Sequence, residues 1–157
     1  MDMQERQRLQ YEHDLKNHFD ILSLSRSDRL KHYGLHFAKY AGRLARGPAE
    51  PKTREETLVD AFLVSLSAAN ALNQTLPTAL SKGEPGDLEF VNHAGRFADA
   101  CEKIDHLEEF RSIALTANAS IISWVLQAGE AHGLDIDHLA SERRAQLAAR
   151  AVYARNA

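Results

Sequence analysis

This chain lacks the features that define several common protein classes. Of its 157 residues only one is a cysteine, Cys101, so no disulfide can form within the chain. Its longest apolar stretch, 113–128, is interrupted by polar residues and is too short to cross a bilayer. The first six residues show no basic segment leading into an apolar one, so we expect no signal peptide. These absences argue against a disulfide scaffold or a membrane protein and predict a cytoplasmic protein in a reducing compartment.

The charge of the chain is also unremarkable. Its formal net charge is −3, and lysine and arginine are spread along the sequence except at the neighbouring Arg143 and Arg144. Proteins that bind nucleic acid or anionic membranes usually carry a basic patch or a basic excess. We therefore expect neither a nucleic acid nor a membrane as a partner.

Several short catalytic motifs are missing as well. The sequence contains no nucleophile-elbow serine, no glycine-rich phosphate loop and no Cys-x-x-Cys pair. Any chemistry must therefore come from polar groups gathered on helix faces.

What the sequence does have is helical periodicity along almost its whole length. We expect one all-α domain over residues 1–157, folded as a helical bundle of five or six helices. The expected helices cover approximately residues 5–23, 27–46, 54–73, 88–104, 106–131 and 135–155. In the first of them, Leu15, Phe19 and Leu22 are expected to face the core.

Two helix starts carry recognisable signals. Thr53 and Glu56 fit a capping box, in which each side chain accepts the backbone N–H of the other residue. Asp105 and Glu108 resemble a second box and predict that the following helix opens near residue 106, with Leu107 available for its core face.

The chain also suggests two duplicated helix pairs. The segment 36–45 can be laid over 96–105, and each is followed by a longer helix rich in small residues. In that alignment Phe37 and Phe97 are equivalent core residues. The alternative is that amphipathic, alanine-rich helices resemble one another in any case.

Paired carboxylates are the candidate Mg²⁺ ligands. Glu56 and Asp60 are four residues apart on the third expected helix, and Asp99 and Glu102 are three apart on the fourth, so each pair shares a helix face. The capping box is a sufficient alternative role for Glu56, and a solvated helix face is the alternative for the second pair. Asp60 stands in an apolar segment, where a buried carboxylate needs a cationic partner or a metal.

Histidines provide a weaker metal pattern. His32 and His36 are four residues apart on one helix, a spacing that can hold Zn²⁺ or iron, although the sequence defines no third ligand. Glu102 and His106 have the same spacing across an expected helix junction.

Two segments resemble the metal-binding helices of the MazG-like all-α nucleoside triphosphate pyrophosphatases. The segment 35–45, LHFAKYAGRLA, resembles the first of these helices, and the segment 55–72, EETLVDAFLVSLSAANAL, resembles the second. The resemblance covers residues 20–75, and it extends to residue 140 only if the two halves are duplicated.

The resemblance implies Mg²⁺-dependent hydrolysis of a nucleotide, with the metal held by Glu-Glu-x-x-Glu on one helix and Glu-x-x-Asp on the next. In this chain the first set of positions holds Lys39, Tyr40 and Arg43, none of which can replace a carboxylate. In the second set Asp60 matches, and Thr57 stands at the glutamate position.

Two readings of this departure stay open. In one, Glu56, Asp60, Asp99 and Glu102 form a composite Mg²⁺ site between the halves, and the protein hydrolyses a nucleotide. In the other, the chain is an inactive helical binding or assembly module in which Arg43 pairs with Asp60 in place of the metal. A homodimer is expected, because two-fold association is the commonest way in which such bundles bury a second apolar face.

Overall fold

The computed structural model of the protein describes residues 1–78 and 83–150, and within these ranges every regular element is helical. The prediction of an all-α bundle is confirmed, but the described ranges contain seven α-helices rather than five or six. The α-helices are α1 (Met3–Asn17), α2 (Phe19–Leu22), α3 (Arg26–Arg46), α4 (Arg54–Leu72), α5 (Asp87–Asp105), α6 (Arg111–Ala131) and α7 (Ile136–Arg150), with a 3₁₀ turn, η1 (Gly47–Ala49), after α3.

The additional helix arises because the expected first helix breaks in two. His18 leaves the helical conformation, with φ −134° and ψ 37°, and α2 is a single turn beyond it. Leu15 and Phe19, expected in the core, are 43% and 58% exposed, so that expectation was wrong for both.

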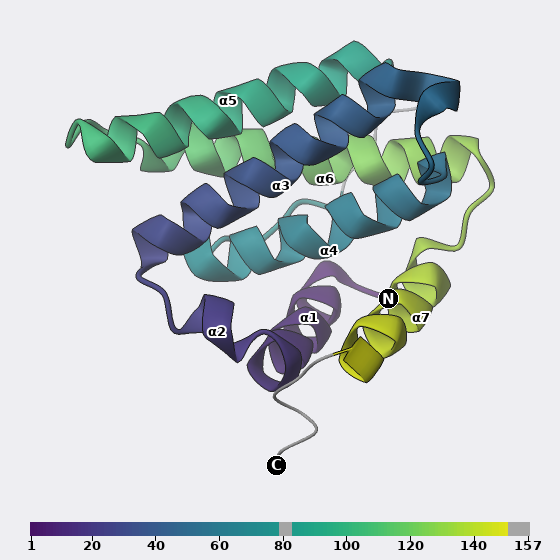
Figure 1. Cartoon of the computed structure of the whole chain (residues 1–157), viewed down its shortest axis with the longest axis horizontal. Helices are drawn as coiled ribbons and strands as arrows, with labels where there is room; N and C mark the ends of the chain where they lie inside the picture. The colour runs from purple at the N-terminus through teal and green to yellow at the C-terminus, as the bar shows by residue number, and fades with distance from the viewer. Residues whose placement is uncertain (79–82, 151–157) are drawn as a thin grey trace.

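The helices form three layers, with α3 and α5 in the first, α4 and α6 in the second, and α1 and α7 in the third (Figure 1). The helices α3, α4, α5 and α6 make a bundle in which α3 packs on α4 and α5, and α6 packs on α4 and α5. A further layer, α1 and α7, lies against α4, and α2 connects α1 to α3. A cavity described below lies between this layer and the α3–α4 side of the bundle.

The helix α4 lies at the centre of the molecule. It contacts α1, α3, α6 and α7, and 14 of its 19 residues are buried. A helix that is buried on nearly all sides must be apolar or carry polar groups with partners inside the protein. The predicted capping box at its start is confirmed, because Thr53 Oγ1 accepts the Glu56 N–H and the Glu56 carboxylate accepts the Thr53 N–H.

The two helix pairs of the bundle meet at Phe37 and Phe97. Both side chains are fully buried, and their rings are 5.0 Å apart at an interplanar angle of 79°. An edge-to-face pair of this kind contributes about 0.5–1.5 kcal/mol beyond the burial of its apolar area. Both residues are therefore core residues, as expected.

The start of α6 differs from the prediction. The helix α5 continues through Asp105, and α6 begins only at Arg111. Between them Leu107 has φ 57° and is 95% exposed, so neither the second capping box nor the core position of Leu107 was correct. The Glu109 carboxylate instead accepts the backbone N–H of Ser112, at 2.9 Å, and so serves the first turn of α6.

The remaining helix ends agree more closely with expectation. Asp135 caps α7 by accepting the His138 N–H at 3.0 Å, and Gly86 is the N-cap of α5, whose first residue is Asp87. The part of the last helix expected beyond residue 150, and residues 79–82 of the connection between α4 and α5, lie outside the described residues.

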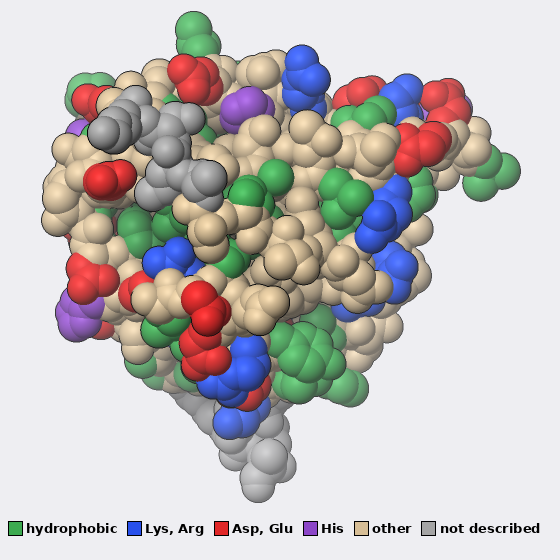
Figure 2. Space-filling view, turned by 180° about the vertical axis from the view of Figure 1, so that it is seen from behind, with side chains coloured by type: hydrophobic (Ala, Val, Ile, Leu, Met, Phe, Trp, Pro, Cys, Tyr) green, Lys and Arg blue, Asp and Glu red, His purple; other side chains and the backbone are tan. Residues whose placement is uncertain are grey.

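The surface is mixed in charge. Seen from behind, acidic and basic side chains alternate across the face, and apolar side chains lie between them in small groups (Figure 2). Among the helices of the described residues, none combines the length and apolar character that crossing a bilayer requires.

Candidate functional site

A cavity of about 240 Å³ lies between the α3–α4 side of the bundle and the layer formed by α1, α2 and α7. Each of these five helices contributes side chains to its lining. The apolar part of the wall is formed by Ile21, Leu22, Leu63, Val64 and Leu147. Polar and charged groups fill the rest, which makes this cavity the place where separate segments of the chain bring their chemistry together.

Asp60 is held by two arginines at one side of the cavity. Its side chain is only 9% exposed. One oxygen, Oδ2, accepts from Arg43 Nη1 on α3 at 3.0 Å, and the other, Oδ1, accepts from Arg143 Nε on α7 at 2.8 Å. The predicted Arg43–Asp60 salt bridge is confirmed, and Arg143 is an additional partner from the far end of the chain.

Positive charge exceeds negative charge on this side of the cavity. Lys39 lies one turn before Arg43, and within residues 1–78 and 83–150 no carboxylate comes within 4 Å of its ammonium group. Burial and the nearby Arg43 lower the pKa of Lys39. Lys39, Arg43 and Arg143 thus place three positive charges near the one negative charge of Asp60. This excess of positive charge attracts an anion that enters this side of the cavity.

The phenol of Tyr40 supports these cations. The guanidinium of Arg43 and the ammonium of Lys39 each lie 5.2 Å from the centroid of the Tyr40 ring, within the range of a cation–π interaction. Burial raises the pKa of Tyr40, so its hydroxyl stays protonated at neutral pH.

His32 and His36 form a hydrogen-bonded chain with Tyr40. The Nε2 atoms of the two imidazoles are 3.0 Å apart, and the Tyr40 hydroxyl lies 3.2 Å from His36 Nδ1. Burial, followed by the charge of Lys39, lowers the pKa of His36 to about 4. The two predicted histidines therefore do share a helix face, and they bind each other there.

Of the four predicted Mg²⁺ ligands, only Asp60 lies in the cavity. Glu56 is exposed at the start of α4, where it serves the capping box and pairs with Lys52. Asp99 and Glu102 are exposed on α5, which does not line the cavity, and Glu102 pairs with His106 at 2.7 Å. Across the described residues, the structure does not gather three of these four carboxylates into one cluster.

The buried face of α1 is a feature that the sequence reasoning missed. Gln10, Asp14 and Asn17 follow one another at helical spacing and are all at most 8% exposed. Asp14 accepts hydrogen bonds from Gln10 Nε2 at 2.9 Å and from Ser67 Oγ of α4 at 2.6 Å. Apolar periodicity does not indicate the buried face of such a helix, because the residues on that face are polar.

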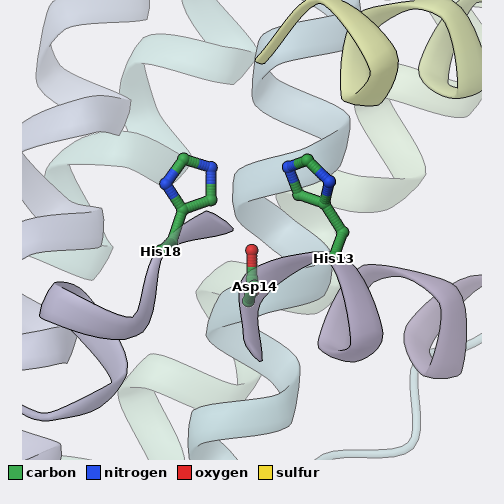
Figure 3. A group of neighbouring side chains, drawn as sticks. All are labelled: His13, Asp14 and His18. Carbon is green, nitrogen blue, oxygen red and sulfur yellow. The ribbon is translucent and has the colours of Figure 1, made fainter. Parts of the chain in front are cut away.

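Two histidines flank Asp14. His13 is 8% exposed, His18 ends α1, and one ligand atom from each of the three residues lies within 4.8 Å of the others. Figure 3 shows the two imidazole rings facing each other across the Asp14 carboxylate. Four of the eight histidines fall within residues 13–36, a concentration that could have signalled this region from the sequence.

Comparison of the chain with family models, with curated proteins and with solved structures finds no match. The geometry described above must therefore carry the functional argument.

Proposed function

We propose that this protein is a helical binding module that takes up a small organic anion in the cavity between α3, α4 and α7, without Mg²⁺. The observation that carries the proposal is the state of Asp60, whose two oxygens are both bound by arginine. A carboxylate engaged in this way is not free to bind a metal ion, while the Lys39 ammonium makes no ion pair within 4 Å among the described residues.

The lining of the cavity suggests the class of ligand. Cationic groups stand on one side, and Leu63, Val64 and Leu147 provide an apolar wall. The cavity volume of about 240 Å³ lies just below the range of about 300–1,000 Å³ typical of sites for drug-sized ligands. A compact molecule with a phosphate or carboxylate group and an apolar body matches this combination.

Descent from a MazG-like enzyme that lost its metal site is compatible with this proposal. In that reading α3–α4 and α5–α6 are duplicated helix pairs, and the acids of the first metal-binding helix have been replaced by Lys39, Tyr40 and Arg43. The Arg43–Asp60 pair then supplies the charge balance that a metal would provide in the enzymes. Hydrolysis by a composite Mg²⁺ site would require Asp60 to leave both arginines and Glu56, Asp99 and Glu102 to come together.

Titration with phenyl phosphate, followed by calorimetry and by thermal stability, tests the proposal. We expect saturable binding that is the same with and without Mg²⁺, and that weakens about tenfold or more in Lys39→Gln, because a hydrogen bond to a charged group is worth about 1.5–3 kcal/mol. Lys16→Gln, which removes an exposed lysine of α1, is the matched control and should bind like the wild type.

Two results would contradict the proposal. One is phosphate binding that appears only when Mg²⁺ is present, and the other is turnover of a nucleoside triphosphate with Mg²⁺. Either would favour the pyrophosphohydrolase. The homodimer stays a prediction, which light scattering on the purified protein can test.

A further inference from the structure

We propose that His13, Asp14 and His18 form a binding site for a divalent transition-metal ion, of the Zn²⁺ class, at the α1–α2 end of the cavity. The proposal goes beyond anion binding and rests on different residues. Two imidazoles and one carboxylate would be the protein ligands, with a further position open for water or an anion.

The first observation is the placement of the three groups. One ligand atom from each lies within 4.8 Å of the other two, and Figure 3 shows both rings turned toward the space above the Asp14 carboxylate. In a tetrahedral zinc site with bonds of about 2.0–2.1 Å, the ligand atoms are separated by about 3.3 Å. His18 sits at the junction of α1 and α2 and is only half-buried, so rotation of its side chain can close the difference.

The second observation is an imidazole nitrogen without a partner. His13 Nε2 is buried, and within the described part of the chain it makes no hydrogen bond. Buried polar atoms in folded proteins nearly always have a partner, and an exception calls for an unseen water or ion. A metal ion between the rings would satisfy this nitrogen.

The third observation is a buried carboxylate that makes no direct ion pair with a described residue, although the charge of Arg144 acts on it from a greater distance. Asp14 is 5% exposed, and its hydrogen bonds come from neutral groups, Gln10 and Ser67. Among residues 1–78 and 83–150 it makes no ion pair within 4 Å, in contrast to Asp60 with its two arginines. A bound dication would balance the charge of this carboxylate.

The surroundings already resemble the support of a metal site. Ligating carboxylates and histidines in proteins are usually held by hydrogen bonds from a second set of residues. Ser67 and Gln10 hold the Asp14 carboxylate, and Arg144 Nη1 donates in turn to Gln10 Oε1 at 3.2 Å.

Asn17 contacts His13 on the Nδ1 side of the ring. Its side-chain amide nitrogen donates to the His13 carbonyl oxygen at 3.0 Å and lies 3.1 Å from His13 Nδ1. A metal on Nε2 requires the proton on Nδ1, so this amide group has to turn when the ion binds.

The donor set points to the kind of metal. Imidazole nitrogen suits Zn²⁺, Co²⁺, Fe²⁺ and similar ions, whereas Mg²⁺ prefers an all-oxygen shell. Sites with three protein ligands and one open position are typical of catalytic rather than structural zinc. Because Asp14 and His18 line the cavity, the open position would face the same space as the cationic groups on α3.

Titration of the protein, made without a histidine tag, with Zn²⁺ and with Co²⁺ as a visible-absorbing probe tests the site. We expect one ion bound per chain, a rise in Tm with metal, and Co²⁺ absorption bands of a tetrahedral nitrogen–oxygen site. His18→Gln and Asp14→Asn should each weaken binding about 100-fold or more, since even supporting residues of metal sites cost 10–100-fold. His18→Gln changes a half-buried side chain and keeps the variant test independent of core packing.

The controls are His32→Gln in the cavity and His138→Gln on the surface of α7, both of which should bind the metal as the wild type does. Retention of the Co²⁺ spectrum in His18→Gln together with its loss in His32→Gln would overturn the assignment in favour of the His32–His36 pair. Absence of binding at millimolar Zn²⁺ and Co²⁺ would overturn it outright. Phenyl phosphate binding measured in the presence of a chelator reports on the anion site separately, so either proposal can fail while the other stands.

Discussion

The substitution Asp60→Asn gives the clearest quantitative test of the arginine clamp. It keeps the shape of the side chain but removes the charge that lies between Arg43 and Arg143. Removing one partner of a buried ion pair costs about 3–5 kcal/mol, because the remaining charge is left uncompensated. The two arginine side chains keep 12% and 19% of their exposure, so water offsets part of this cost and we expect a loss of about 3 kcal/mol.

The assay is thermal or urea unfolding of the purified protein. For a chain of this length 1 kcal/mol corresponds to about 2–4 °C in Tm, so Asp60→Asn should lower Tm by about 6–12 °C. Arg143→Met removes one of the two charged hydrogen bonds and should cost less, about 2 kcal/mol. Asp99→Asn, on the exposed face of α5, is the matched control and should change stability by less than about 0.5 kcal/mol.

An unchanged or raised Tm for Asp60→Asn would refute this reasoning. A carboxylate kept for a metal is strained when the metal is absent, since it faces other acids, and its neutralisation then stabilises the fold. The sign of the Tm change therefore separates a structural Asp60 from a metal ligand.

Other predictions concern packing, capping and pH. Gly129→Ala would place a Cβ 2.7 Å from Ile136 Cγ1 at the α6–α7 junction and should lower the free energy of unfolding by about 1–3 kcal/mol. Gly95 in α5 has open space around it, so Gly95→Ala should raise the free energy of unfolding by about 0.5–1 kcal/mol. Unfolding curves measure both changes. Thr53→Ala removes the N-cap of α4 and should cost about 1 kcal/mol in the same assay. The pKa of His36 is lowered to about 4 in the folded state, so the unfolded chain takes up this proton first as the pH falls from about 6.5. The free energy of unfolding should therefore decline between pH 6.5 and 4, and it should decline less steeply in His36→Gln. A flat pH dependence in the wild type would contradict the lowered pKa, which NMR titration can check directly.

The bundle itself follows from the sequence because its helices bury apolar residues at regular helical spacing. Leu30, Phe37, Phe62, Phe90 and Phe97 all lie where the 3.6-residue period places them. The start of α6 could not be predicted in this way, because Asp105 and Glu108, which resemble a capping box, lie at the end of α5 and in the turn after it.

The layer formed by α1 and α7 was much harder to predict. The buried side of α1 consists largely of polar residues that find partners on α4, and such partners are separated in sequence by more than 50 residues. From the sequence alone, a row of polar residues on one helix face predicts a solvent-exposed face. Only the structure shows the hydrogen-bond partners that another helix places opposite it. The same applies to the cluster of His13, Asp14 and His18, which depends on the break at the end of α1.

The candidate cavity was predictable in part. The pairing of Arg43 with Asp60 was predictable, because a carboxylate in an apolar helix needs a cation and Arg43 stands where the MazG-like resemblance predicts a carboxylate. The participation of Arg143 was not predictable, because it depends on α7 folding back against α4, 83 residues from Asp60.

Calorimetric titration with Mg²⁺, with and without a non-hydrolysable nucleoside triphosphate, tests whether Asp60 serves the fold or a metal ion. If Asp60 serves the fold and the cavity binds an anion without Mg²⁺, we expect no saturable Mg²⁺ binding at millimolar concentration, and phenyl phosphate binding that Mg²⁺ does not change. Saturable Mg²⁺ binding that disappears in Asp60→Asn would contradict this expectation and would identify Asp60 as a metal ligand.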